Sequence, residues 1–265
     1  MEPIQKERKI YRYKNGHVDE MTDLVVSEYP LTIKVNGEEF STIVSTPEYL
    51  EDLTLGFLAS EGVIQSPDEV KSLTISRTQG VAHVEVQNLQ RFRQLFRAKR
   101  VVTSCCGMSR QGFVFVNDEL TAKKMEGVHV RVTFDECFHL IDELQQQSDL
   151  FQSTGGVHNA SLCTTDGTVL SRRDIGRHNA LDKIYGYCLR EKIDLQDKIV
   201  VFSGRISSEI LMKVAKIGCE IVLSKSAPTD LALTAAEELG ITTIGFIRGE
   251  SLNVYTRPDR VVNLD

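Results

Sequence analysis

The first half of the chain alternates apolar and polar residues over short stretches, which predicts β-strands. Leu31, Ile33 and Val35 alternate with polar neighbours, and the same period continues beyond Asn36-Gly37, a dipeptide that favours a type I′ turn. This pattern predicts a β-hairpin. Two more strands are expected at about 72–77 and 82–87, whereas residues 1–28 are polar and show no clear period, so we expect them to be irregular.

Helical spacing of apolar residues begins after Thr46-Pro47 and continues to Gly62. A proline favours the first turn of a helix and a glycine its end, so a helix is expected between them. Residues 66–69 read Ser-Pro-Asp-Glu, which is typical of a capping box and predicts a short helix. The basic stretch 89–100 is interpreted as a solvated helix face.

The second half alternates helices with strands. We expect a strand at 127–132, a helix at 133–150, and a strand from His158 that Asp166-Gly167 turns back on itself. Helices are then expected at 177–192, 207–217 and 229–239, followed in turn by strands at 198–203, 220–224 and 242–247. Such alternation predicts βαβ units and a parallel sheet. The expected fold is therefore an α+β N-terminal part, residues 1–130, followed by an α/β part, residues 131–265.

Composition supports a globular protein and argues against two classes of partner. The chain has 265 residues, of which 41% are hydrophobic and 26% charged, and its net charge is −6. A negative balance does not favour binding to nucleic acid or to an anionic membrane. The N-terminus shows no apolar signal region and no apolar run reaches membrane-spanning length, so a cytoplasmic location is expected.

Six cysteines in a chain without a secretion signal are expected to be free thiols rather than disulfides. Four of them belong to helical or strand patterns and are interpreted as core residues: Cys137, Cys163, Cys188 and Cys219. Cys105 and Cys106 belong to no apolar pattern. They follow Lys99-Arg100 and a β-branched run, and they precede Gly107 and Arg110. Two buried thiols remain an alternative, but neighbouring cations favour a reactive cysteine because they stabilise the thiolate.

Four loops of the second half carry cations, at 174–179, 203–208, 224–229 and 245–251, and all of them except 224–229 also contain glycine. Two of them follow apolar strands, where open α/β sheets bind ligands and where helix N-termini attract anions. Each loop alone is explained by an ordinary turn, a helix cap at Asp174 or Ser207, or a surface arginine. Together they indicate a large, multiply charged ligand such as a nucleotide or dinucleotide.

Other chemistries lack their motifs. A zinc deaminase needs His-x-Glu and Pro-Cys-x-x-Cys, whereas His158 is followed by Asn159-Ala160 and the chain contains no Cys-x-x-Cys. A catalytic zinc is therefore not expected, and neither is thioredoxin-like redox chemistry. The Walker A and GxGxxG motifs are also absent.

Several segments, in the same order along most of the chain, resemble the FdhD family of formate dehydrogenase accessory sulfurtransferases. The most specific is 174–183, Asp-Ile-Gly-Arg-His-Asn-Ala-Leu-Asp-Lys. The others are 28–31, 35–37, 55–62, 154–158, 203–205, 226–229 and 245–248. The resemblance implies a homodimeric carrier of persulfide sulfur from a cysteine desulfurase to the Mo-bis-molybdopterin guanine dinucleotide of formate dehydrogenase, which the protein binds during transfer.

The resemblance also implies a C-terminal fold similar to cytidine deaminase without its zinc, and a mobile loop, here 99–112, that carries Cys-Gly-x-Cys. In this chain the matching residues read Cys106-Gly107-Met108-Ser109, with an extra cysteine at Cys105. Cys106 is then the persulfide carrier, and Ser109 stands at the position of the second cysteine of the family pattern. The segment that matches cofactor binding in the family consists of Phe246, Ile247, Arg248, Gly249, Glu250 and Ser251.

These observations lead to one main hypothesis and two alternatives. The main hypothesis is a sulfurtransferase whose Cys106 thiolate is favoured by Arg100 and Arg110. Phosphates or guanine are expected to contact Gly176, Arg177, Gly204, Arg205, Lys225 and Arg248. A non-catalytic chaperone that shelters the molybdenum cofactor and docks to apo formate dehydrogenase is the first alternative, and a thiol redox sensor using Cys105 and Cys106 is the second.

Overall fold

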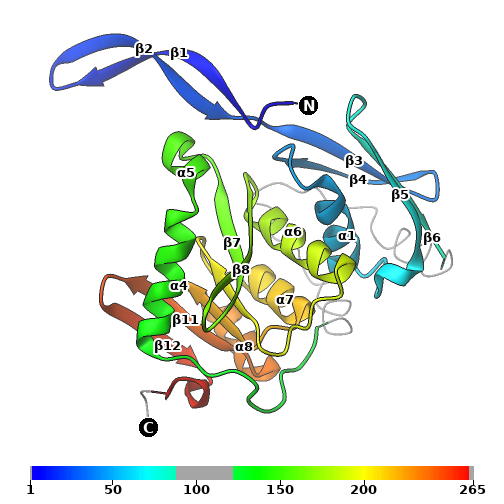
Figure 1. Ribbon diagram of the computed structural model, residues 1–265, viewed down its shortest axis with the longest axis vertical. Helices are drawn as coiled ribbons and strands as arrows, with labels where there is room; N and C mark the ends of the chain where they lie inside the picture. The colour runs from blue at the N-terminus through cyan, green and yellow to red at the C-terminus, as the bar shows by residue number, and fades with distance from the viewer. Residues whose placement is uncertain (1, 88–121, 263–265) are drawn as a thin grey trace.

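A computed structural model describes residues 2–87 and 122–262. The described strands form a two-stranded, a four-stranded and a six-stranded sheet (Figure 1). The predicted cysteine loop 99–112 and the basic stretch 89–100 lie outside the described residues. The structure therefore describes the chain before and after residues 88–121, and the predicted division into two parts is not tested within that segment.

The N-terminal residues form a β-hairpin, so the prediction that 1–28 is irregular was wrong. Strands β1 (Gln5–Lys14) and β2 (His17–Val26) pair antiparallel along their whole length and project from the body (Figure 1). Asn15 and Gly16 both have positive φ, 51° and 87°, as a type I′ turn requires. Most side chains of this ribbon are exposed on both faces, so the sequence carries no apolar alternation.

The predicted hairpin around Asn36-Gly37 is confirmed within the four-stranded sheet, whose order is β4-β3-β6-β5. Its strands are β3 (Tyr29–Val35), β4 (Glu38–Ser45), β5 (Val70–Ser76) and β6 (Val81–Val86). Leu31, Ile33 and Val35 are fully buried, because this face of the sheet packs on helix α1. β3 and β6 are parallel, and the other pairs are antiparallel.

Helix α1 (Leu50–Ser60) begins later than the predicted start at Pro47. The preceding residues are held by the second half of the chain, since the Thr46 N–H donates to Asp174 at 3.0 Å. Tyr49, the residue before the helix, is left-handed with φ 54°. The short helix predicted at 66–69 is a single 3₁₀ turn, Pro67–Glu69, capped by the Ser66 hydroxyl as expected.

The six-stranded sheet has the order β12-β11-β10-β9-β7-β8. Its strands are β7 (His158–Thr164), β8 (Gly167–Asp174), β9 (Ile199–Phe202), β10 (Ile221–Ser224), β11 (Thr242–Arg248) and β12 (Ser251–Thr256). β9, β10 and β11 are parallel, which confirms the predicted βαβ core. β12 was not predicted. It pairs antiparallel with β11, so 246–248 belong to a strand rather than to a loop.

Both faces of this sheet are covered, as its fully apolar central strands predict. The helices α6 (Arg177–Arg190), α7 (Ser208–Ile217) and α8 (Asp230–Leu239) cover one face. Helix α4 (Phe134–Gln146) covers the other. Val200 and Phe202 of β9 face the first layer, and Ile199 and Val201 face the second.

Two further predictions in the segment before β7 were wrong. The single helix expected at 133–150 is divided into α4 and α5 (Asp149–Thr154), with Ser148 donating its hydroxyl to the Leu144 carbonyl between them. The strand expected at 127–132 is only a bridge at Val132. Its backbone groups are used elsewhere, because Arg260 donates to the Gly127 carbonyl at 2.8 Å.

The two halves share one core. A single buried cluster contains β3 and α1 residues together with residues of α6, α7 and β9. Gly56 of α1 and Gly186 of α6 allow the two helices to touch through their main chains. The domain boundary at 130–131 stays a prediction, but packing is continuous across it.

Candidate functional site

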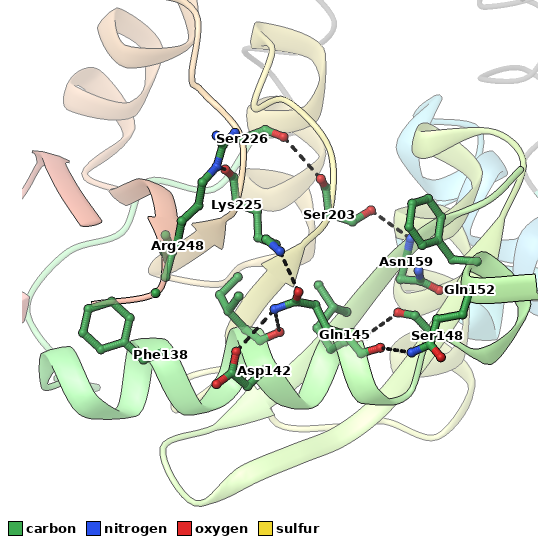
Figure 2. Close-up of a pocket in the computed structure, with 15 residues that line it drawn as sticks. Phe138, Asp142, Gln145, Ser148, Gln152, Asn159, Ser203, Lys225, Ser226 and Arg248 are labelled. Carbon is green, nitrogen blue, oxygen red and sulfur yellow. Dashed lines mark hydrogen bonds between the residues drawn. The ribbon is translucent and has the colours of Figure 1, made fainter. Parts of the chain in front are cut away.

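A cavity of about 690 Å³ lies at the edge of the six-stranded sheet where β9, β10 and β11 end (Figure 2). Helices α4 and α5 form its other wall. The lining residues are Phe138, Ile141, Asp142, Leu144, Gln145, Ser148, Phe151, Gln152, Asn159, Ser203, Lys225, Ser226, Ile247, Arg248 and Gly249. The carboxyl edge of parallel strands is the expected ligand position in such sheets.

Two cations come together in this cavity. Lys225 follows β10 and donates from Nζ to Oε1 of Gln145 at 2.6 Å, while Arg248 ends β11 and donates from Nε to the Lys225 carbonyl at 3.3 Å (Figure 2). Within the described part of the chain, neither side chain has a carboxylate within 4.0 Å. Cations without a protein counter-ion in a concave site attract anionic ligands such as phosphates.

Hydrogen bonds between loops hold the floor of the cavity in place. Ser203 and Asn159 exchange two bonds of 3.0 Å, which join the end of β9 to the start of β7. The Ser224 hydroxyl accepts from the Ser226 N–H at 3.0 Å and donates to the Gly204 carbonyl at 2.8 Å. A Cβ at Gly204 would lie 3.0 Å from the Phe202 ring. This glycine therefore permits close packing and does not itself line the cavity.

The long motif 174–183 has a structural role that its sequence did not show. The Asp174 carboxylate is fully buried and accepts from the Gly176 N–H and from Nδ2 of Asn179, both at 2.8 Å. It also pairs with the fully buried Lys183 at 2.7 Å. Asp174 was considered as a helix cap, but the residue at the cap of α6 is Gly176. The carboxylate instead fixes the turn before the helix.

His158 lies beside the cavity at the start of β7, half-buried and stacked on Phe202 at 6.5 Å between ring centroids. Burial, reinforced by the positive charge of Arg177, lowers the pKa of this histidine. The neutral imidazole is therefore favoured at neutral pH.

The structure brings together part of the predicted binding set. Lys225, Ile247, Arg248 and Gly249 line the cavity. The residues that do not line it are Gly176, Arg177, Gly204, Arg205, Phe246, Glu250 and Ser251. Their roles in binding stay predictions. Cys106, Arg100 and Arg110 lie outside the described residues.

The sequence pattern did not lead us to expect that residues of α4 and α5 line the cavity. Phe138, Asp142 and Gln145 follow at helical spacing of four and three residues, and this spacing was the available signal. Phe138 and Ile141 lie on the same helical stripe as Cys137, which was predicted to be a core residue.

The four described cysteines are buried, as the sequence predicts. Burial raises the pKa of the Cys137, Cys163 and Cys188 thiols to about 12, and it also raises the pKa of Cys219. The thiolate is the reactive form of cysteine, so these four are inert at neutral pH.

Among residues 2–87 and 122–262, no group of three or more His, Cys, Asp or Glu side chains is placed to hold a metal ion. No helix in the part of the chain that the structure describes is long and apolar enough to cross a membrane.

The fold and the cavity define a mixed α/β protein with a site suited to a multiply charged anion. Residues 26–262 match the model of the FdhD/NarQ family, and the chain belongs to that family. Curated relatives named sulfur carrier protein FdhD are 55% identical in Shouchella clausii, over 97% of both chains, and 54% identical in Bacillus pumilus, over 97% of this chain and 98% of the other.

A solved structure is also similar. The crystal structure of a proposed formate dehydrogenase accessory protein from Desulfotalea psychrophila matches with a TM-score of 0.79 and 25% identity, over 98% of this chain and 100% of the other. The whole described fold is thus shared with an experimentally determined structure.

Proposed function

We propose that this protein is a sulfur carrier required for formate dehydrogenase activity, and that it passes persulfide sulfur from a cysteine desulfurase to the enzyme's molybdenum cofactor. The observation that carries the proposal is family membership over nearly the full chain, with relatives named sulfur carrier protein FdhD. The relative of known structure is itself named a formate dehydrogenase accessory protein, which supports formate dehydrogenase as the partner.

Cys106 is the proposed carrier. Its thiolate attacks the outer sulfur of the desulfurase persulfide, a new S–S bond forms on Cys106, and the desulfurase thiolate leaves. Release of that sulfur as sulfide consumes two electrons, which a thiol reductant supplies. The four described cysteines support this assignment because they are buried with raised pKa values and offer no thiolate.

The proposed acceptor is Mo-bis-molybdopterin guanine dinucleotide, which enters as substrate. The cavity supports this choice because Lys225 and Arg248 suit the phosphates of a dinucleotide. The likeness to a cytidine-deaminase fold without zinc, and a homodimer, are part of the same proposal and rest on the family resemblance.

A Cys106→Ala variant tests the proposal against the chaperone alternative. We expect the variant to bind GDP like the unchanged protein and to fail to activate formate dehydrogenase, while Cys105→Ala, the matched control, retains activation. Full activation by Cys106→Ala would refute sulfur transfer through this residue and favour a chaperone.

Mass spectrometry separates transfer from redox sensing. After incubation with a cysteine desulfurase and cysteine, we expect the unchanged protein to gain the mass of one sulfur atom and Cys106→Ala to gain none. Loss of two hydrogens without added sulfur would instead indicate a disulfide and a redox sensor.

A further inference from the structure

The ribbon formed by β1 and β2 carries an apolar patch at its free end. Tyr11, Tyr13 and Val18 are 69%, 73% and 65% exposed, and we call these three residues the tyrosine patch. Tyr13 lies directly opposite Val18 in the antiparallel ladder, and Tyr11 is two residues away along β1, so the three side chains share one surface of the ribbon. They expose on the order of 300–400 Å², a size at which a contiguous patch marks an interaction site.

Little of the ribbon is buried. Most side chains of β1 and β2 are exposed, and the two strands project from the body (Figure 1). Ion pairs across the ribbon join Lys9 to Glu20 at 2.7 Å and Arg12 to Asp23 at 3.6 Å. Exposed ion pairs contribute little to stability, and a two-stranded ribbon by itself is marginally stable in water. A partner that covers the tyrosine patch would supply the apolar burial that stabilises the ribbon.

The base of the ribbon lies at the rim of the cavity. β2 packs against α5, whose Phe151 and Gln152 line the cavity, and the Ser153 hydroxyl donates to Oε1 of Gln5 at 3.4 Å. Figure 1 shows the ribbon extending past α5. Ten residues of antiparallel strand span about 34 Å, which is close to the diameter of a small domain. A protein that docks at the mouth of the cavity can therefore also reach the tyrosine patch.

The charge pattern of the ribbon argues against a second copy of the same ribbon as its partner. β1 carries five cations and one carboxylate, whereas β2 carries three carboxylates. A two-fold contact between ribbon edges pairs β1 with β1 or β2 with β2, and it therefore places like charges opposite each other. Pairing of β1 with β2 of another copy does not close and leads to open chains of molecules. A different protein suits this surface better.

We propose that the tyrosine patch is a docking site for apo formate dehydrogenase, which receives Tyr11 and Tyr13 in an apolar pocket while it faces the mouth of the cavity. The inference rests on the proposed function, which makes this enzyme the acceptor. Tyrosine is typical of the centre of protein interfaces because it buries a large, rigid ring at a small cost in conformational entropy. The ribbon then holds the acceptor beside the cavity and raises its effective concentration there.

Binding of purified apo formate dehydrogenase to the full chain, measured by biolayer interferometry, tests the docking site. The double variant Tyr11→Ser/Tyr13→Ser should bind about thirtyfold more weakly, as expected when the central aromatic residues of an interface are truncated. Tyr11→Phe/Tyr13→Phe keeps both rings and should bind like the unchanged protein. Arg12→Gln is the matched control, because Arg12 is exposed and its side chain points to the opposite surface of β1.

Two further measurements separate docking from the other steps. Tyr11→Ser/Tyr13→Ser should gain sulfur from the desulfurase and bind GDP like the unchanged protein. Its activation of formate dehydrogenase should fall when the carrier is limiting and should recover at higher carrier concentration, because only the affinity for the acceptor has changed.

The outcomes distinguish this inference from the proposed function. Unchanged binding of apo formate dehydrogenase by Tyr11→Ser/Tyr13→Ser refutes the docking site and leaves the sulfur-carrier proposal intact. A lower oligomeric state of this variant in light scattering, or loss of its sulfur loading, also overturns the inference, because the tyrosine patch then contacts a second copy or the desulfurase. The proposed function fails separately, if the unchanged protein gains no sulfur from the desulfurase.

Discussion

Replacing Gly56 with alanine tests how the two halves of the molecule are joined. Helices α1 and α6 cross at Gly56 and Gly186, and a Cβ at Gly56 would lie 1.8 Å from the Asp182 carbonyl oxygen. A Cβ at Gly186 would lie 1.8 Å from the carbonyl oxygen of Asp52. Neither obstacle is a side chain that rotates away, so the helices must move apart.

Two effects of opposite sign compete in this substitution. Alanine favours a helix over glycine by about 1 kcal/mol. Overpacking costs about 1–3 kcal/mol, and sometimes more, and main-chain obstruction places Gly56 at or above the upper end of that range. We therefore expect a net loss of about 2 kcal/mol in the free energy of unfolding, which lowers the melting temperature by roughly 4–8 °C for a chain of this size.

Urea and thermal unfolding of the full chain, followed by circular dichroism, measure the effect. Gly186→Ala should behave like Gly56→Ala, and the double variant should lose less than the sum, because the second methyl meets helices that have already separated. Thr234→Ala, at an exposed position of α8, is the control for helix propensity and should be neutral or slightly stabilising. A Gly56→Ala protein as stable as the unchanged one would refute the close crossing.

Three further predictions concern buried and titratable groups. Lys183→Met leaves the Asp174 carboxylate buried without its cation and should lower the free energy of unfolding by about 3–5 kcal/mol in urea titrations; an unchanged midpoint would contradict the buried pair. Because the pKa of His158 is lowered in the folded protein, the unfolded chain binds more protons at mildly acidic pH. The stability that neutral His158 contributes is therefore present above pH about 6.5 and is lost as the pH falls through the folded pKa. His158→Gln should flatten the dependence of the free energy of unfolding on pH, and a pH profile identical to that of the unchanged protein would refute this reasoning. Alkylation of the native protein at neutral pH, mapped by mass spectrometry, should leave the four described cysteines unmodified until the chain is unfolded. These are Cys137, Cys163, Cys188 and Cys219, and rapid modification of any of them would contradict their burial.

Local sequence patterns predicted the positions of most helices and strands. The turn Asn36-Gly37 fixed a hairpin because both residues adopt positive φ, and the apolar runs at 199–202 and 221–223 identified strands covered on both faces. The N-terminal hairpin was missed although Asn15-Gly16 forms the same kind of turn. Its strands are exposed on both sides, so burial imposes no pattern on them.

Long-range contacts explain the errors at element boundaries. Helix α1 begins late because Thr46 bonds to Asp174, a residue 128 positions further along the chain. The segment 127–132 pairs with Arg260 and Glu220 in place of a neighbouring strand. A local sequence pattern does not predict hydrogen bonds between residues so far apart in the chain, because these bonds form only where the packing of the rest of the chain brings the two residues together.

The sequence by itself determined the family, the parallel sheet, the inert core cysteines and the cations at the ends of β10 and β11, because each depends on residue type and local spacing. Only the tertiary structure decided which of the four predicted cation-bearing loops share a cavity. It placed Lys225 and Arg248 together and left Arg177 and Arg205 outside. The tertiary structure also showed that α4, including Asp142, forms one wall of the cavity. The sequence did not reveal this, because some residues of α4 pack against the sheet whereas others line the cavity.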